Sequence, residues 1–269
     1  METPKRFNLP TDPRTIKPQD LQLSYVLKYT GTGLLKYFLY SLILSYVRET
    51  RFHWNPTKLQ LYQFDDPWVA IDLYLLGLAL SLLLDYADHL LILPLCYIFK
   101  MEYTPIMNAV YLSCSVREFW GSRWNSMIQR GLKCSIFDPV LEALKGFPIP
   151  FKFKVTIATL LTFVFSAIMH EWCILIVCDE PTTYEQLAFF TVQAFICTFE
   201  VLVSIMFKRI FGLKIGHVFP KVVQVLWATI AVLSTSPLFL NPFIRGKVFD
   251  KFHLDYDIMK AYVERNFLK

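Results

Sequence analysis

Charged residues are scarce in this sequence, and no dense run of basic residues occurs. Asp, Glu, Lys and Arg together make up 18% of the 269 residues, whereas 55% are hydrophobic and the mean hydropathy is +0.40. A soluble domain has a lower apolar share and distributes its apolar residues at period 2 or 3.6. Here they gather into blocks, which indicates a membrane protein. The lack of Lys/Arg clusters argues against a nucleic-acid-binding protein.

Metal-binding cysteine patterns and a signal peptide are also missing. The six cysteines form no CxxC pair and no zinc-finger spacing, so neither a disulfide framework nor a zinc site is predicted. Residues 1–30 contain prolines and charged residues but no apolar segment of the kind that a signal peptide needs. We therefore expect a polar N-terminal segment that ends in a short amphipathic helix on the membrane surface, with insertion directed by an internal span.

The apolar blocks predict an all-α fold, namely a multi-pass transmembrane helical bundle with interfacial or re-entrant helices. We expect about five spans. They belong to a membrane domain at 31–245, which is followed by a polar C-terminal tail at 246–269. The expected spans are 34–47, 68–99, 155–178, 187–207 and 222–240.

Two of these spans have unusual features. Residues 34–47 are few for a crossing and include Lys36, so they span only if that side chain snorkels to the interface and residues 25–33 lengthen the helix. Residues 68–99 contain Pro94 and exceed the length of one upright helix at a rise of about 1.5 Å per residue. One long tilted helix and a span followed by a re-entrant piece both fit.

The charges of the loops orient the spans. Basic residues are in excess in the long polar loop at 100–154, whereas the next loop contains Asp179, Glu180 and Glu185 and no basic residue. Short cytosolic loops carry an excess of Lys and Arg. The loop at 100–154 and the N-terminus are therefore expected on the cytosolic side.

An ionisable cluster lies in the span at 68–99. Asp85, Asp88 and His89 stand at helical positions i, i+3 and i+4, which places them on one face. They could hold a metal ion or relay a proton. The alternative is the interfacial end of a helix that faces water or protein.

A polar stripe runs down the span at 155–178. Its members recur at spacings of three and four and so share one helical face: Thr159, Thr162, Ser166, His170 and Cys173. An ionisable residue in a span is costly to bury and by default indicates function. We therefore expect the stripe to face a cavity. The alternative is a histidine that is simply hydrogen-bonded between helices.

The basic loop contains a second polar face. Glu118, Ser122, Asn125 and Gln129 follow helical spacing, with tryptophans and arginines beside them. Such a helix lies at the membrane interface or dips into it. A plain membrane-surface helix with a basic fringe is the alternative.

Two runs together resemble a family pattern. "LSCSVREFWGSRWN" at 112–125 resembles the loop motif of the membrane-bound O-acyltransferase superfamily, and "FSAIMHEW" at 165–172 resembles its histidine motif. Within that superfamily, the two motifs most resemble those of the wax synthase branch of plants and fungi. "FFTVQAFICTFE", which ends in Glu200, also resembles that branch, and residues 237–245 do so more weakly. The resemblance covers residues 100–245, which we expect to be a wax synthase-like acyltransferase core.

The resemblance implies an enzyme that moves an acyl group from acyl-CoA to the hydroxyl of a lipophilic acceptor, such as a long-chain alcohol, a sterol or a secondary metabolite. Acyl-CoA is then a co-substrate. The expected surroundings are the lipid bilayer of the endoplasmic reticulum, with no cofactor, metal, nucleic acid or obligatory protein partner.

The resemblance also implies that His170 and Asn125 are the catalytic pair. A base must take the proton of the hydroxyl that attacks the thioester, and the ordinary pKa of histidine suits that role. The thioester oxygen becomes negative, and an amide such as that of Asn125 can bind it. Alternatively, Asn125 orients the acyl chain or the imidazole.

Other residues are expected to bind substrate. Arginines of the basic loop suit the CoA phosphates because a guanidinium matches phosphate geometry. A carboxylate in mid-span must be paired, and for Glu200 we expect a partner on the helix that carries His170. The candidates for substrate binding are Arg117, Arg123, Arg130, Lys133, Trp120, Trp124, Glu171 and Glu200.

Two other functions stay open at this point. A catalytically silent, truncated membrane scaffold of the same fold fits the shortness of the chain relative to the superfamily. A small proton or metal transporter fits the ionisable residues inside the spans, and it would use Asp85, Asp88, His89, His170 and Glu200.

Overall fold

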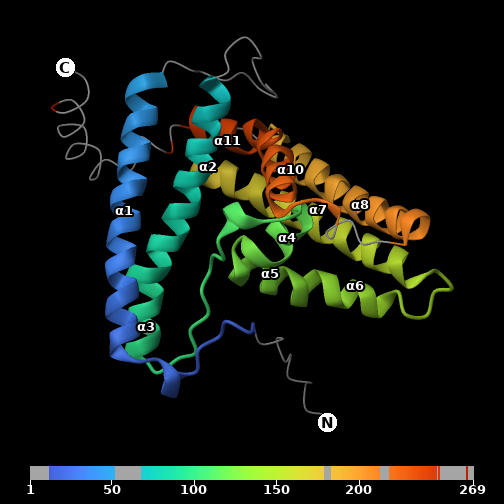
Figure 1. The fold of residues 1–269 in the computed structure, drawn as a ribbon, viewed down its shortest axis with the longest axis horizontal. Helices are drawn as coiled ribbons and strands as arrows, with labels where there is room; N and C mark the ends of the chain where they lie inside the picture. The colour runs from blue at the N-terminus through green and yellow to red at the C-terminus, as the bar shows by residue number, and fades with distance from the viewer. Residues whose placement is uncertain are drawn as a thin grey trace.

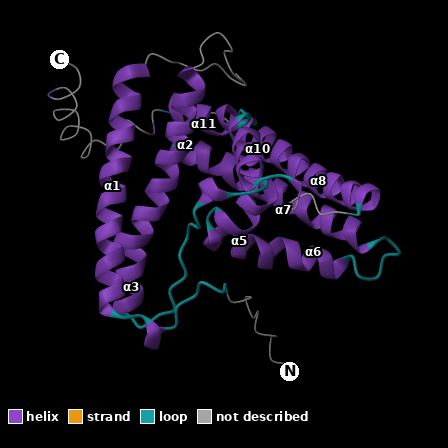
Figure 2. Ribbon diagram, in the orientation of Figure 1, coloured by secondary structure: helices purple, strands orange, loops and turns teal. Residues whose placement is uncertain are grey.

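The structure is a computed structural model that describes residues 12–51, 68–178, 183–212 and 218–246, together with residues 248 and 265. Within these ranges most of the chain is helical, as Figure 2 shows. The single β contact in this part of the chain is an antiparallel bridge between Ile16 and Tyr103. The predicted all-α class is confirmed. The expected C-terminal tail lies almost entirely outside the described residues.

The N-terminal half of the fold is an antiparallel pair of long helices. α1 (Leu23–Arg51) and α2 (Trp68–Ala87) lie side by side in Figure 1. α2 continues through a π-helical turn at Asp88–Ile92 into α3 (Leu93–Ile98). Apolar side chains from both long helices fill the space between them, and the fully buried ones include Tyr40, Leu44, Leu73, Leu76 and Ala79.

The C-terminal half is a second helical pair with two shorter helices beside it. α7 (Phe151–Val177) and α8 (Glu185–Phe211) lie against each other, and α10 (Lys221–Leu233) and α11 (Ser236–Arg245) complete this half (Figure 1). The buried side chains that join α7, α8 and α11 are Ala167, Phe189, Phe190 and Leu238. This core lies next to the histidine of the polar stripe and holds its helix in place.

Residues 99–150 connect the two pairs. The sequence predicts a polar loop here, and the structure shows instead a folded segment that packs against α7 and α8. It leaves α3 as an extended stretch and then forms a series of short helical pieces (Figure 1). These are Val110–Leu112, α4 (Val116–Glu118), the π-helical turn Phe119–Arg123, α5 (Ser126–Leu132), the π-helical turn Lys133–Phe137 and α6 (Asp138–Ala143).

Three helical segments are long and apolar enough to cross a membrane, namely Ile71–Ile98, Phe151–Val177 and Glu185–Phe211. The bent pair of α10 and α11 raises the number to 4 if it forms one broken span. Large apolar side chains such as Trp172 and Ile176 are exposed on α7. An apolar outer surface on a helix whose backbone is satisfied internally suits lipid. The protein is an integral, multi-pass membrane protein.

The prediction of about five spans is therefore too high for the described residues. Residues 34–47 lie in α1, which is not one of the candidate spans. The Nζ of Lys36 lies 2.8 Å from Oδ2 of Asp85 on the neighbouring helix, so this lysine pairs with a carboxylate of the protein. An apolar pattern predicts a helix, but it does not distinguish a lipid neighbour from a protein neighbour.

Two further span predictions are decided by the structure. Residues 68–99 form one long helical path, and the π-helical turn at Asp88–Ile92 precedes Pro94. A π turn alters the hydrogen-bond register, which accommodates a proline without an N–H close behind it. The expected span at 222–240 is wrong as a single straight helix, because α10 and α11 meet at 42°. Pro237 stands in the first turn of α11, where proline favours a new helix start.

The short surface helix expected at the end of residues 1–30 is also wrong within the described part. Residues from Leu23 onward already belong to α1, and only a 3-10 turn at Pro18–Asp20 comes before it. Residues 1–11 lie outside the described residues. The apolar side chains of this region join α1 because they pack against α3 and the stretch that follows it.

Candidate active site

A cavity of about 1150 Å³ lies between the short helices of the connecting segment and α7, α8 and α10. Pockets for small ligands measure roughly 300–1,000 Å³, so this one has room for a large ligand. Asn125 at the start of α5 and His170 of α7 both line it. The fold thus brings together two side chains that lie in separate motifs of the sequence.

The polar stripe of α7 faces this cavity. Thr159, Thr162, Ser166 and His170 all line it, which confirms that the stripe has a cavity to face. Cys173, the next member, is exposed and is not among the lining residues. The polar part of this wall therefore ends at the histidine.

The ring of His170 is held in one orientation by its own helix. Its Nδ1 lies 2.8 Å from the carbonyl oxygen of Ser166, one turn earlier. A carbonyl oxygen only accepts hydrogen bonds, so Nδ1 carries a proton and donates it. In the neutral imidazole Nε2 then has the lone pair, and it is the nitrogen that can accept a proton from a ligand.

Aromatic rings fix the position of His170 further. Its ring centroid lies 4.5 Å from that of Phe190 in α8 and 5.7 Å from that of Phe239 in α11. Both phenylalanines also line the cavity. Apolar rings on these sides limit the motion of the imidazole and reduce its contact with water. The same surroundings lower the local dielectric around a reacting group.

Asn125 stands at a backbone position that few residues adopt. Its φ is 43°, in the left-handed region, where Asn is more readily accommodated than most other residues. Its Oδ1 accepts a hydrogen bond from the N–H of Ile128 at 3.2 Å and so caps α5. That contact identifies the oxygen of the amide, so the NH₂ group points away from the helix start. No acceptor within the described part of the chain contacts this NH₂ group, and its donors are available to a ligand.

The single polar helix expected over residues 118–129 is wrong. Glu118 and Ser122 belong to α4 and the π-helical turn that follows it, whereas Gln129 belongs to α5. Between these pieces Trp124 is extended and Asn125 is left-handed, which interrupts the helix. Helical spacing does not reveal this break. Asn is favoured at a helix start and is also tolerated inside a helix, so the residue type fits either position.

A short extended stretch at residues 103–108, here termed the support segment, lies beside the loop that carries Asn125. Ser126 donates to it twice. The N–H of Ser126 lies 2.8 Å from the carbonyl oxygen of Ile106, and its hydroxyl lies 2.7 Å from that of Pro105. These two bonds tie the residue after Asn125 to the support segment.

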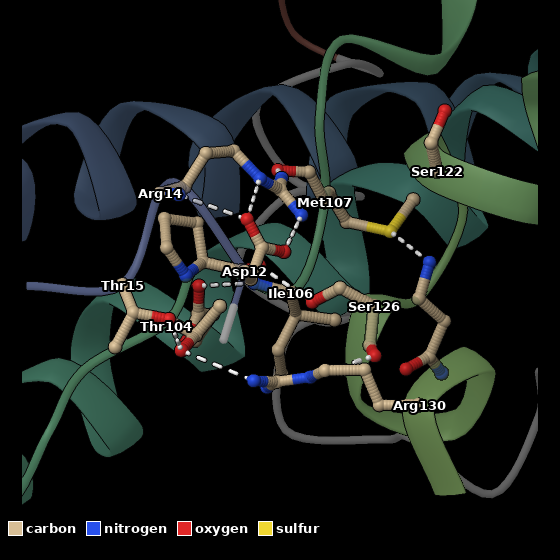
Figure 3. A network of polar contacts seen from close by, with 12 residues as sticks. Asp12, Arg14, Thr15, Thr104, Ile106, Met107, Ser122, Ser126 and Arg130 are labelled. Atoms are coloured by element: carbon tan, nitrogen blue, oxygen red, sulfur yellow. Dashed lines mark hydrogen bonds and ion pairs between the residues drawn. The ribbon is translucent and has the colours of Figure 1, made fainter. Parts of the chain in front are cut away.

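The N-terminal stretch contacts the other side of the support segment. Arg14 donates to the carbonyl oxygen of Met107 at 3.3 Å, and the sulfur of Met107 lies 3.4 Å from the backbone nitrogen of Asn125. Figure 3 shows Ile106 and Met107 between Arg14 on one side and Ser126 on the other. The hydrogen bonds of Arg14 hold the pKa of the Asp12 carboxyl below its usual value. Arg14, which precedes α1, is thus linked through Met107, which follows α3, to the backbone of Asn125.

Trp120 and Trp124 separate the main cavity from a smaller one of about 130 Å³, and they line both. The indole Nε1 of Trp120 donates to Oε1 of Gln193 at 2.9 Å. Gln193 is fully buried in α8 and lines neither cavity, but it holds Trp120, a contact that the sequence reasoning missed. Its signal was a polar side chain inside an apolar span, which usually marks a partner between helices.

Glu200 of α8 lines the cavity and accepts three hydrogen bonds. Its Oε1 lies 2.9 Å from both the backbone nitrogen of Val116 and Nε1 of Trp227, and its Oε2 lies 3.1 Å from the backbone nitrogen of Arg117. The expected partner on the helix of His170 is therefore wrong. Glu200 binds the start of α4 instead, because the first N–H groups of a helix have no acceptor within it.

Glu171 is buried next to His170 but is not among the residues that line the cavity. Its Oε1 accepts from the backbone N–H groups of Gln186 and Leu187 at 2.9 and 3.2 Å. These groups belong to the first turn of α8, which again lacks helical acceptors. Glu171 thus ties α7 to the start of α8.

The predicted phosphate-binding residues divide into two sets. Arg117 and Lys133 line the cavity, whereas Arg123 and Arg130 do not. Arg123 pairs with Glu118 at 2.7 Å, and Arg130 donates to oxygen atoms of α5 and of the support segment. The guanidinium groups of the second set are engaged within the protein.

Asp85, Asp88 and His89 have separate partners. Asp85 pairs with Lys36, Asp88 binds the support segment, and Nδ1 of His89 lies 3.3 Å from Oγ1 of Thr32. No group of three His, Cys, Asp or Glu side chains in the described ranges is close enough to share a metal ion. Asp85 and His89 both face α1, whereas Asp88 faces the support segment, so the three side chains do not converge on one point. Asp88 and His89 face protein and are buried, as the alternative expected.

Comparisons with known proteins place this site in a family. Residues 103–192 match the profile of the "Membrane bound O-acyl transferase family". The chain is 29% identical to "Acyl-CoA--sterol O-acyltransferase 1" of Arabidopsis thaliana over 163 residues, which are 60% of this chain and 45% of the relative. It is 26% identical to "Long-chain-alcohol O-fatty-acyltransferase" of Simmondsia chinensis over 168 residues, which are 62% of this chain and 46% of the relative.

A further relative is "Probable long-chain-alcohol O-fatty-acyltransferase 9" of Arabidopsis thaliana, 28% identical over 163 residues that make up 61% of this chain and 47% of the relative. The chain therefore spans less than half the length of these curated relatives. No solved structure matches the chain. The matched residues include both motifs that carry Asn125 and His170. Residues 103–192 thus match the membrane-bound O-acyltransferase family, and the chain is a distant homologue of plant long-chain-alcohol and sterol acyltransferases.

Proposed function

We propose that this protein transfers an acyl group from acyl-CoA to the hydroxyl of a lipophilic alcohol, in the manner of a wax synthase. The observation that carries the proposal is that, within the described residues, one cavity contains a free hydrogen-bond acceptor and free hydrogen-bond donors on two side chains. His170 presents an Nε2 that can accept a proton, and Asn125 presents amide N–H groups that can donate. The matched relatives whose names include long-chain-alcohol or sterol acyltransferase support the same class of acceptor.

The proposed reaction needs one base and one oxyanion donor. Nε2 of His170 takes the proton of the acceptor hydroxyl as its oxygen attacks the thioester carbon. The carbonyl oxygen becomes negative and accepts a hydrogen bond from the Asn125 amide, a contribution of roughly 3 kcal/mol for one such donor. The intermediate then collapses, the carbon–sulfur bond breaks, and the imidazolium returns its proton to the CoA thiolate. The thioester is already activated, so no acyl-enzyme intermediate is required.

The same cavity has basic residues for the CoA phosphates. Lys133 and Lys152 line it, and Arg117 lines it near the start of α4. A lysine ammonium can pair with phosphate as a point charge. We therefore assign the phosphate contacts to these three residues instead of Arg123 and Arg130. Trp120 and Trp124 offer apolar wall to the acyl chain or the alcohol.

The proposal also includes the organisation of the chain and its location. Residues 31–245 form the membrane domain, within which residues 100–245 are the acyltransferase core, and the protein acts in the endoplasmic reticulum membrane. Its partners are acyl-CoA, a lipophilic alcohol and the bilayer. The identity of the alcohol and the length of the acyl chain are the variables that the test below determines.

The test is the release of CoA by microsomes that contain the wild type, His170→Ala or Asn125→Ala. They are offered palmitoyl-CoA or acetyl-CoA with a panel of long-chain alcohols and sterols, and the products are identified by mass spectrometry. Alcohol-dependent release by the wild type alone, with the matching ester as product, is the expected result. Full activity of His170→Ala would overturn the proposal. Inactivity of folded wild type with every pair would favour a catalytically silent scaffold.

A further inference from the structure

One buried carboxylate hydrogen-bonds the support segment, whose Tyr103 also packs against α1 and α3. Asp88 begins the π-helical turn after α2 and is 0% exposed. Its Oδ2 lies 2.9 Å from the hydroxyl oxygen of Tyr103 and 3.0 Å from the backbone nitrogen of Ile106. Both groups donate to it. The carbonyl oxygen of Ile106 accepts from the N–H of Ser126, the residue after Asn125. Ile106 is thus fixed at both of its backbone polar groups.

We propose that Asp88 is a positioning residue that sets the place of Asn125 in the cavity. This inference rests on the proposed acyl transfer, because it gives the position of the amide its importance. Asp88 lines neither cavity, so it does not touch a substrate there. It acts through Ile106 and Ser126 on the loop that holds the amide.

The hydrogen bonds of Asp88 all go to the support segment. Its Oδ1 has no hydrogen-bond partner in the part of the chain that the structure describes. A buried carboxylate with one oxygen unpartnered is costly, and an apolar side chain would pack between helices at lower cost. The other oxygen receives both donors from Tyr103 and Ile106. These contacts therefore indicate that Asp88 serves to hold the support segment.

The sequence around Ile106 makes this contact sensitive. Pro105 has no N–H. The backbone donor that reaches the carboxylate is therefore the N–H of the next residue, Ile106. The phenol of Tyr103 provides the second donor, and burial together with the Asp88 charge raises the pKa of Tyr103 far above its ordinary value. Tyr103 therefore remains a donor across the physiological pH range. Asp88 lies before residues 103–192, the part that matches the family, and it holds the beginning of that part.

Replacing Asp88 should disturb catalysis more than substrate binding. A displacement of the reacting geometry by about 1 Å can lower a rate by about 100-fold. We expect Asp88→Ala to lower kcat by about 10- to 100-fold, because the Asn125 amide loses its fixed place. The KM for acyl-CoA should change little, because Lys133 and Lys152 belong to parts of the chain that Asp88 does not contact.

Asp88→Asn is the conservative variant. The amide oxygen of Asn can accept from both Tyr103 and Ile106, so this variant should recover most of the kcat that Asp88→Ala loses. Asp85→Ala is the matched control. It removes a carboxylate from the same helix, one turn earlier, whose partner is Lys36 and not the support segment. Its kcat should equal that of the wild type.

The experiment measures both kinetics and amide hydrogen exchange on the full-length protein in detergent micelles. The expected result for Asp88→Ala is faster exchange at 103–108 and 123–128 with unchanged exchange in α7, and for Asp88→Asn and Asp85→Ala it is the wild-type pattern. Wild-type kcat or exchange in Asp88→Ala would overturn the inference. So would an Asp88→Asn variant as impaired as Asp88→Ala, or exchange that rises throughout α7. If the wild type shows no acyl transfer, the proposed function fails and the exchange pattern still decides whether Asp88 positions the loop.

Discussion

His170 and Asn125 line one cavity but are held there in opposite ways. His170 lies in a regular span, and a carbonyl oxygen of its own helix directs its ring. Asn125 lies in an irregular loop, and its place depends on the support segment and on residues that bind it from α2 and from the N-terminal stretch. The acid–base group thus stands on a rigid element, whereas the amide is placed by long-range contacts. A change to the contacts that hold the loop of Asn125 should therefore affect folding and activity together.

The largest expected effect comes from His170→Ala. The base is lost, so we expect the transfer rate to fall by about 100- to 10,000-fold. Among the described residues the ring bonds to its own helix alone and packs on two phenylalanines, so thermal unfolding should change little. Rate and unfolding temperature measured on the same preparation test both halves. A large loss of stability would show that the histidine is held by more than its helix, which breaks the comparison.

Asn125 allows its two tasks to be separated. In Asn125→Asp an oxygen still caps α5, but the amide donors are gone, so the rate should fall by about 100- to 1,000-fold with stability retained. Asn125→Ala loses the cap as well and places a methyl-bearing residue at a positive φ, which should lower stability by about 1–2 kcal/mol. Equal unfolding midpoints of the two variants in urea would contradict this separation.

Glu200 is a second carboxylate that holds a backbone segment beside the cavity, namely the start of α4. Glu200→Leu leaves three N–H donors without an acceptor and should lower stability by about 2–4 kcal/mol. Glu200→Gln keeps one acceptor oxygen, and its NH₂ group meets the N–H of Arg117, so an intermediate loss is expected. The unfolding midpoint in guanidinium measures both. If Glu200→Leu is as stable as the wild type, the start of α4 is held by other means.

The smallest effect is expected at the edge of the support segment. Arg14 lowers the pKa of Asp12, so the carboxylate contributes to stability above its unfolded pKa and loses this contribution as the pH falls through the lower folded value. Asp12→Asn should therefore be slightly less stable than the wild type at neutral pH, and the difference should begin to shrink below about pH 4 and disappear as the pH falls through the lower folded pKa. Unfolding curves of both proteins between pH 3 and 7 measure it, and a constant difference would contradict the assignment.

Several features of this fold follow from local sequence. The apolar blocks are longer than those of a soluble domain. Their composition and length alone therefore predict helices that suit a membrane. The polar stripe of α7 is a regular helical pattern, and it does face the cavity. The match of residues 103–192 to an acyltransferase family likewise depends on sequence.

Other features are beyond a local pattern. The break at Asn125 and the π-helical turn at Asp88 interrupt faces that helical spacing predicts as continuous. The bend between α10 and α11, by contrast, falls at the polar residues 234–236 and Pro237, which mark a break in the apolar block. At Asn125 and Asp88 the interruption goes with contacts to the support segment, which local spacing does not report.

The sequence by itself determined the class of the protein and its family segment, and it marked His170 and Asn125 as the candidate pair. Only the tertiary structure decided that both share one cavity, that Glu200 binds the start of α4, and that Asp88 reaches the loop of Asn125 through Ile106. The physical reason is that periodicity reports which face of an element is apolar. A buried carboxylate instead bonds to whatever donors the packing brings near it, and those donors can be far away in the chain.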